Sequence, residues 1–195
     1  MTKAERTRQF IIEQSAPLFN TKGVAGTAMS DIMEATKMAK GGLYGHFESK
    51  EQLSCAVVDY CLNTVSEKIS ASLKKAKSSK EKLLLYIDHF AHVDKPVIEG
   101  GCPMLNFGLE ADDTNPAIKQ KIKRGIEVSQ ALLTEIIESG KTSGEFKPDW
   151  NTREFAVKMF AMLEGGTLMA RVTNDKSAMQ TIVKMLKEEI QLYTL

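Results

Sequence analysis

The segment TAMSDIMEATKMAKGGLYGHFESK, residues 27–50, predicts two short helices joined by a tight turn. We expect the first helix at about Ser30–Thr36, because Ser30 can cap its start and apolar side chains recur along one side. Lys37–Ala39 then forms the turn. The second helix follows at about Lys40–His46.

Two helices of this length around a short turn are typical of a DNA-binding helix-turn-helix, whose second helix enters the major groove. The second helix would keep Leu43 inside and direct Lys40, Tyr44 and His46 outward. Their ammonium, phenol and imidazole groups can donate to phosphate oxygens, and such contacts set a protein's register on DNA. The alternative is the solvated face of an ordinary helical hairpin, and residue types alone leave both interpretations open.

The segment also resembles the N-terminal domain of TetR-family transcriptional regulators. In that family a lysine and a small residue precede L-Y-x-H-F, and S-K-E-x-L then opens the fourth helix. The matching residues here are KGGLYGHF at 40–47 and SKEQL at 49–53, preceded by LFNTKG at 18–23. Several residue types recur at fixed spacing, so the resemblance is specific, and it covers roughly the first quarter of the chain.

The resemblance implies which residues contact DNA. Phosphate contacts are implied for Thr27, Lys40, Tyr44, His46 and Lys50. Gly42 and Gly45 stand where other members carry side chains that touch bases, and each weakens the helix by about 1 kcal/mol relative to alanine. We therefore expect either the backbone of this helix or the neighbouring Lys40 to approach the bases closely, and Gly41 and Gly42 are also candidate DNA-binding residues. Thr36–Lys37 stands where a small residue and glycine are common in the turn.

Composition describes an ordinary globular protein. The 195 residues are 43% hydrophobic and 26% charged, and the net charge of +1 gives no sign of a nucleic-acid partner. Residues 1–50 carry seven Lys and Arg against five Asp and Glu, a weak basic bias. No apolar run approaches the roughly 18 residues of a membrane span, and the N-terminus lacks an apolar signal core. We therefore expect a cytoplasmic protein with no membrane partner, and the three cysteines suggest no disulfide framework.

The rest of the chain predicts further helices. Thr2 with Glu5 resembles a capping box at the start of a first helix that Pro17 should bend and Gly23 should end. The later helices are expected at about residues 49–77, 80–97, 117–139, 152–172 and 176–193, with caps at Ser49, Ser78, Asn151 or Thr152, and Asp175. With the resemblance, this predicts an all-α fold. An N-terminal three-helix helix-turn-helix DNA-binding domain, residues 1–48, precedes a C-terminal helical ligand-binding and dimerisation domain, residues 49–195.

The segment EGGCP, residues 99–103, breaks one helix and starts another. Cys102 and Pro103 fit the cap and the first helical residue. Because backbone N–H groups at a helix start favour a thiolate, Cys102 is a candidate sensor of oxidants or electrophiles. The alternative is a small buried residue beside a tight turn. A metal site with His89 and His92, or a hydrolase built on Cys102, lacks further ligands and an orienting group, so we expect no metal, cofactor or catalytic residue.

Apolar residues along the last two helices predict a dimer seam, for which the candidates are Met162, Gly166, Met169, Ile182, Met185, Leu186 and Ile190. The resemblance implies that two such helix pairs form a four-helix bundle across a two-fold axis. It also implies a cavity between the middle helices for an apolar or aromatic ligand. The candidate ligand-binding residues are Phe90, Cys102, Leu105, Phe107, Met159 and Phe160. Methionine and phenylalanine at helical spacing fit a core equally well.

Taken together, these features predict a homodimeric, DNA-binding transcriptional regulator that is not an enzyme. We expect a repressor that a small apolar or electrophilic effector, or modification of Cys102, releases from a palindromic double-stranded DNA operator. Two alternatives remain: a helical protein-interaction module, or an enzyme that depends on Cys102 and does not bind DNA.

Overall fold

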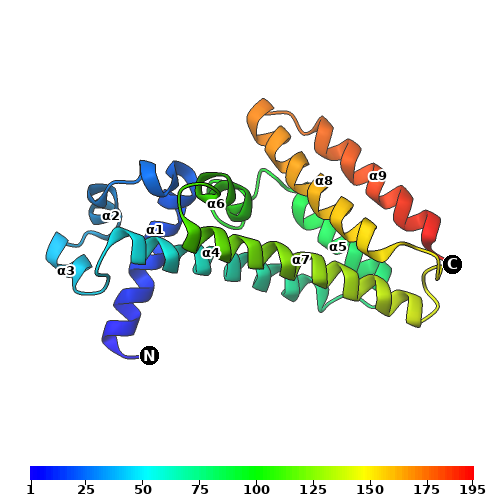
Figure 1. Ribbon diagram of the computed structural model, residues 1–195, viewed down its shortest axis with the longest axis horizontal. Coiled ribbons are helices and arrows are strands. Elements are labelled where there is room, and N and C mark those ends of the chain that lie inside the picture. Colours follow the sequence, from blue (N-terminus) through cyan, green and yellow to red (C-terminus); the bar gives the residue numbers. More distant parts are fainter. The chain divides into compact units, whose positions relative to one another are not determined.

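The computed structural model describes residues 1–195 and contains nine α-helices and no β-strand (Figure 1). One isolated antiparallel bridge joins Phe146 to Thr194. The predicted all-α fold is therefore confirmed. The helices are α1 (Lys3–Gly26), α2 (Met29–Thr36), α3 (Lys40–Tyr44), α4 (Lys50–Leu73), α5 (Ser79–Ala91), α6 (Pro103–Ala111), α7 (Pro116–Thr142), α8 (Thr152–Thr173) and α9 (Ser177–Tyr193). None of them has the length and apolar character that spanning a membrane requires.

Side-chain caps that the sequence predicts begin several of these helices. Thr2 and Glu5 form the capping box of α1: the Thr2 hydroxyl accepts the Glu5 N–H, and the Glu5 carboxylate accepts the Thr2 N–H. The side-chain oxygens of Ser49, Ser78 and Asn151 each accept an N–H three residues further on. Each cap satisfies an N–H that has no partner inside its helix.

The break predicted at Gly23 is present in α1. Gly23 has φ 76° and ψ 167°, and a short helical turn continues from there to Gly26. Backbone angles stay helical through Pro17, so the non-helical point of α1 is the glycine and not the proline. A positive φ is strained for most residues other than glycine, which explains why the break falls at a glycine.

Other boundaries also differ from the prediction. α4 ends at Leu73 and not at about residue 77, and the N-cap of α9 is Lys176 and not Asp175. α2 begins at Met29, because the carboxylate of Asp31 caps it by accepting the Ala28 N–H at 3.0 Å, a role expected of Ser30. α5 ends at Ala91, well before residue 97. Pro96 disfavours helical angles in the residue before it and cannot donate to the helical ladder, so the segment leading to α6 is not helical.

The chain forms two compact units. The first unit contains residues 1–65 and 96–123, and the second contains residues 66–95 and 124–195. The borders fall inside α4 and α7, so these two helices contribute to both units. The first unit includes the whole predicted head, residues 1–48, and also α6, which the sequence assigns to the C-terminal domain.

The core of the first unit forms where α1 packs against α2 and α6. Ile11, Phe19, Ile32 and Phe107 are almost completely buried there. Their apolar spacing on each helix leaves the opposite faces of α2 and α3 exposed.

In the second unit, α8 packs against α9, and α5 packs against both (Figure 1). Trp150 lies among Phe146, Phe155 and Tyr193, and its ring stacks on Tyr193 at 5.0 Å with an interplanar angle of 4°. The Leu195 N–H donates to the Glu145 carbonyl, so the C-terminus is tied to the segment between α7 and α8.

Candidate DNA-binding interface

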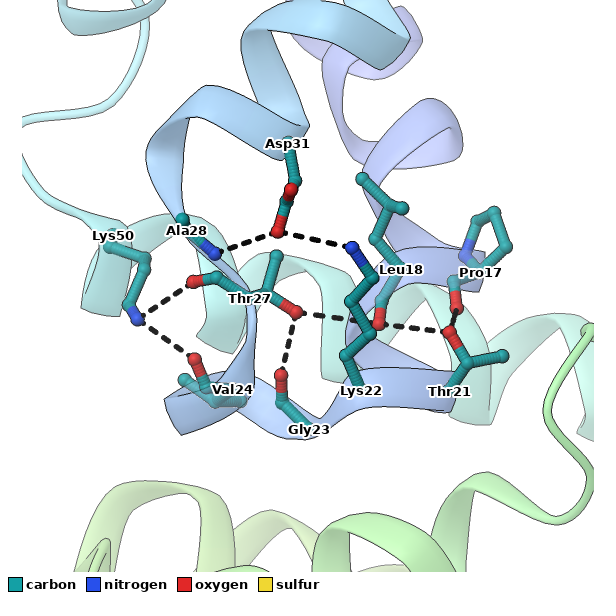
Figure 2. Close-up of polar contacts among 10 residues, drawn as sticks. All are labelled: Pro17, Leu18, Thr21, Lys22, Gly23, Val24, Thr27, Ala28, Asp31 and Lys50. Atoms are coloured by element: carbon teal, nitrogen blue, oxygen red, sulfur yellow. Dashed lines mark hydrogen bonds and ion pairs between the residues drawn. The ribbon is translucent and has the colours of Figure 1, made fainter.

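Besides the apolar packing of α2 on α1, one carboxylate links the two helices. Asp31 accepts the Ala28 N–H at the start of α2 and pairs with Lys22 of α1 at 3.2 Å (Figure 2). The Ala28 N–H and the Lys22 ammonium hold the pKa of Asp31 below its ordinary value. The carboxylate therefore stays charged and joins the two helices at neutral pH.

The turn between α2 and α3 uses an unusual backbone conformation. Lys37 adopts the left-handed region with φ 55°, as a C-terminal helix cap commonly does. The buried Thr36 hydroxyl donates to the Ile32 carbonyl at 2.7 Å and closes the last turn of α2. The predicted turn at Lys37–Ala39 is therefore confirmed, with a lysine in the conformation that glycine would adopt more easily.

Helix α3 presents an exposed face with cationic, phenolic and bare-backbone groups. Lys40, Gly41, Gly42 and Tyr44 are exposed, and Leu43 on the opposite side is buried. The Lys40 ammonium lies 5.8 Å from the centroid of the Tyr44 ring, within the range of a cation–π contact. These four residues are among those that the sequence assigns to DNA contact.

A Cβ atom at Gly41 would meet no heavy atom of the chain within 4 Å. At Gly42 it would lie 3.2 Å from the terminal methyl of Met38, a close contact with a flexible side chain. The fold thus gives no steric reason for the glycine at position 41.

His46 is half-buried directly after α3, and Phe47 beside it is buried. The Arg8 guanidinium of α1 lies over the Phe47 ring at 4.1 Å from its centroid. This stacking brings a cation from α1 to the turn that follows α3.

Thr27 and Lys50 make contacts inside the chain (Figure 2). The Thr27 side chain is completely buried, and its hydroxyl donates to the Gly23 carbonyl at 2.7 Å. The Lys50 ammonium donates to the carbonyls of Val24 at 2.8 Å and of Thr27 at 3.0 Å. An ammonium has three hydrogens, so Lys50 keeps one donor for another partner. The sequence motif assigns both residues to phosphate contact and did not indicate these backbone contacts.

The predicted ligand-binding residues are distributed over both units. Cys102, Leu105 and Phe107 belong to the first unit, where Cys102 is the half-buried N-cap of α6 and Phe107 is buried. In the second unit, Phe90 of α5 and Met159 and Phe160 of α8 are buried on helices that pack together. An open groove of about 650 Å³ on the same unit is lined by other residues, at the end of α5 and along α9 with its N-cap.

The last two helices carry both buried and exposed candidates for the dimer seam. Gly166, Ile182, Leu186 and Ile190 are buried within one chain, and a Cβ at Gly166 would lie 2.9 Å from Ile182. At Gly166 and Ile182, α8 and α9 therefore approach each other closely. Met162 is half-buried, and the exposed apolar side chains of the two helices are Val157, Leu168, Met169, Val172, Met185 and Leu192. These exposed apolar side chains are the candidates for a surface that another protein covers.

The three thiols differ in their surroundings. Burial raises the pKa of Cys61 to about 12 and also raises the pKa of Cys55. Both thiols are therefore poor nucleophiles at neutral pH. No group of three or more His, Cys, Asp and Glu side chains in residues 1–195 is arranged to hold a metal ion.

Comparison with known proteins identifies the family. Residues 79–186 match the family described as tetracyclin repressor-like, C-terminal domain, and residues 11–57 match that of bacterial regulatory proteins, tetR family. The chain belongs to the TetR family of transcriptional regulators. It is therefore a DNA-binding transcriptional regulator and not an enzyme, and the alternative of a Cys102-dependent enzyme is set aside.

Relatives of this TetR-family protein are similar to it in sequence over nearly the whole chain, and two solved structures are also similar in fold. A TetR-family regulator from Cytophaga hutchinsonii is 37% identical, with a TM-score of 0.95 over 100% of this chain and 98% of that one. A TetR regulator from Chloroflexus aurantiacus is 34% identical, with a TM-score of 0.94 over 100% and 98%. The HTH-type transcriptional repressor DhaR of Mycobacterium sp. (strain GP1) is 24% identical over 94% of this chain and 91% of its own length.

Proposed function

We propose that the protein is a homodimeric repressor whose α3 enters the major groove of a palindromic operator. The observation that carries this proposal is the exposed face of α3, with Lys40 and Tyr44 beside glycines at positions 41 and 42. Lys40 and Tyr44 supply donors to phosphates, and the bare backbone at Gly41 leaves room for a close approach of the DNA. Further phosphate contacts from His46, Lys50 and the backbone at Thr27 complete the proposed interface.

The second subunit would dock on the exposed apolar side chains of α8 and α9, centred on Met169 and Met185, which are 43% and 52% exposed. Isologous pairing of the same face on two copies gives the two-fold axis that a palindromic operator matches. The buried seam candidates, such as Gly166 and Leu186, would support this face by fixing α8 to α9.

Two kinds of effector fit the proposal. An apolar or aromatic molecule would be bound among Phe90, Met159 and Phe160 of the second unit. Leu105 and Phe107 of the first unit are separate candidates. Alternatively, an oxidant or electrophile would modify Cys102. Burial raises the pKa of the other two thiols, which favours reaction at Cys102.

Selection from a random DNA pool tests the proposal, because it requires no assumption about the operator sequence. Selection with the full chain, followed by footprinting, should give two protected half-sites about one helical turn, roughly 34–36 Å, apart. Affinity should fall steeply with salt, and Lys40→Ala should reduce the slope of log K against log salt by about one for each subunit. Recovery of no preferred sequence, at low salt and under reducing conditions, would contradict the proposal.

The effector can be assigned by comparing two perturbations of the operator complex. Electrophile treatment should release wild-type protein but leave Cys102→Ser bound if the thiol is the sensor. Apolar and aromatic compounds should instead release both proteins and change the fluorescence of Trp150, the single tryptophan, if a cavity is the sensor. If neither treatment changes operator affinity, both effector assignments are wrong.

A further inference from the structure

The turn that leads from α1 into the helix-turn-helix has two backbone N–H groups that need an acceptor from outside the helix. After the break at Gly23, Val24 and Ala25 begin a new helical turn, and the first N–H groups of such a turn have no partner within it. The carboxylate of Glu110 on α6 accepts both, from Val24 at 2.8 Å and from Ala25 at 2.7 Å. One side chain therefore caps this turn in the manner of an N-cap residue, although it lies 86 positions away from Val24.

Gly23 is required for this contact in two ways. Its φ of 76° lies in the left-handed region, and a Cβ built there would lie 2.8 Å from Oε2 of Glu110. The carboxylate thus sits against bare backbone. A larger residue at position 23 would both strain the break and displace the carboxylate.

The same turn is held on its carbonyl side by Lys50, which donates to Val24 and Thr27 (Figure 2). Glu110 therefore binds N–H groups of residues 24–27, and Lys50 binds carbonyl groups of the same residues. Thr27 lies just before α2, and the turn at Lys37 connects α2 to α3. The orientation of the helix-turn-helix depends on how firmly this turn is fixed.

Helix α6 is itself anchored to α1, so Glu110 is not a mobile surface group. One turn before Glu110 on α6, the Asn106 amide donates to the Asn20 carbonyl at 2.9 Å and to the Gly100 carbonyl at 2.9 Å. The buried Asn20 amide in turn donates to the carbonyls of Glu99 and Gly101. The two attachments, at Asn20 and at Val24, lie four residues apart on α1, as Asn106 and Glu110 do on α6.

From these contacts we infer that Glu110 is a positioning residue for operator binding, acting through the turn at Val24–Thr27. The inference rests on the proposed role of α3 in reading DNA. Loss of the carboxylate leaves at least one of the two N–H groups without its acceptor and loosens the turn, so the helix-turn-helix must be ordered when DNA binds. That ordering lowers the operator affinity of a chain that remains folded.

The direction in which operator affinity changes distinguishes a positioning role of Glu110 from a simple effect of its charge. Removing a carboxylate makes the protein more positive, and charge alone would then tighten binding to DNA. Positioning predicts the opposite. Glu110→Asp keeps the charge but is one methylene shorter, so it also loses reach to the two N–H groups.

The test measures operator affinity of full-length wild type, Glu110→Gln and Glu110→Asp at one salt concentration, with Asp113→Asn as the matched control. Asp113 is an exposed carboxylate just after α6. We expect both Glu110 variants to bind roughly five- to fifty-fold more weakly, in the range of typical coupling between sites. Asp113→Asn should bind as well as wild type or better, and circular dichroism should show all variants to be folded.

Amide hydrogen exchange supplies the second readout, because Val24 and Ala25 should exchange faster in both Glu110 variants than in wild type. Folded Glu110→Gln and Glu110→Asp proteins that bind operator as tightly as wild type would overturn the positioning role while leaving the proposed function intact. If wild type binds no operator, or binds one that Tyr44→Ala binds equally well, the proposed function fails first and the positioning role fails with it.

Discussion

At Gly41, the packing of the chain does not explain why glycine is present, because a Cβ there would meet nothing within 4 Å. At Gly23 and Gly100 the packing does explain the glycine, because both residues have a positive φ. A Cβ would lie 2.8 Å from Glu110 at Gly23, and 2.6 Å from the Asn20 carbonyl oxygen at Gly100. A substitution at Gly41 can therefore test DNA binding without disturbing the packing of the fold.

Gly41→Ala should therefore stabilise the free protein and weaken the DNA complex. The free energy of unfolding should rise by up to about 1 kcal/mol, because alanine is the better helix former. Operator affinity should fall, since the added methyl group occupies space that the DNA backbone or a base is expected to use. Urea unfolding and DNA titration of the same preparation test both effects, and an unchanged affinity would show that α3 stays further from the DNA.

His89 gives the protein a pH-dependent stability. Burial, and then the nearby Lys68 ammonium, lower the pKa of His89 from its ordinary value of 6.5. The unfolded chain therefore binds more protons than the folded one below that value, so stability falls as the pH drops through 6.5. Urea unfolding at about pH 7.5 and about pH 5.5 should show a smaller loss for His89→Gln than for wild type. Equal losses in the two proteins would contradict this assignment.

Residue-level features were predictable where they depend on a motif. The exposure of Lys40 and Tyr44 and the burial of Leu43 follow from the KGGLYGHF pattern. The carbonyl contacts of Lys50 and the capping by Glu110 span 26 and 86 positions of sequence. Contacts of this kind depend on how helices pack, which no local pattern encodes.

At the scale of the helix, side chains within one turn of the helix start determine where several of the helices begin. Thr2, Ser49, Ser78 and Asn151 cap their helices as the sequence predicts, because a cap needs only residues within one turn. The end of α5 and the exact start of α2 were less predictable. α5 is also capped from a distance, since the Glu145 carboxylate accepts the N–H groups of Ser79 and Lys80 at 2.8 and 3.0 Å.

We expect the Glu145 carboxylate to contribute measurably to the free energy of unfolding. Glu145 joins the α7–α8 segment to the start of α5, and the Trp150–Tyr193 stack joins the same segment to the end of α9. Glu145→Ala should lower the free energy of unfolding by about 0.5–2 kcal/mol, the usual effect of losing a helix cap. Glu188→Ala on α9, an exposed carboxylate paired only loosely with Lys184 at 3.8 Å, is the control and should change it little.

At the scale of the whole molecule, the family and the all-α fold could be predicted, because the motif is specific and helical periodicity is strong. The proposed dimer surface cannot be assigned from spacing. Residues of one apolar helix can face either the partner helix of the same chain or a second chain, and spacing alone cannot separate the two. Ile182, Leu186 and Ile190 are buried within one chain, so Met169 and Met185, which are exposed, are the residues that we propose for the second role.

A charge placed on the exposed apolar face should therefore separate the subunits. Met169→Glu should give a monomer by analytical ultracentrifugation, because a carboxylate buried in an interface without a partner is strongly unfavourable. Leu109→Glu, at a residue that is 67% exposed on α6, is the matched control and should leave the assembly unchanged. A Met169→Glu protein that sediments like wild type would place the interface elsewhere.

The most direct test of the central claim, that the exposed face of α3 binds operator DNA, is the affinity of the Lys40→Ala/Tyr44→Ala protein for a selected operator. Lys184→Ala, which removes an exposed lysine from α9, controls for the loss of positive charge. We predict that the double variant loses at least about tenfold in affinity, equivalent to about 1.4 kcal/mol, while Lys184→Ala binds like wild type. A folded double variant that binds the operator as tightly as wild type would show that another surface of the protein reads the DNA.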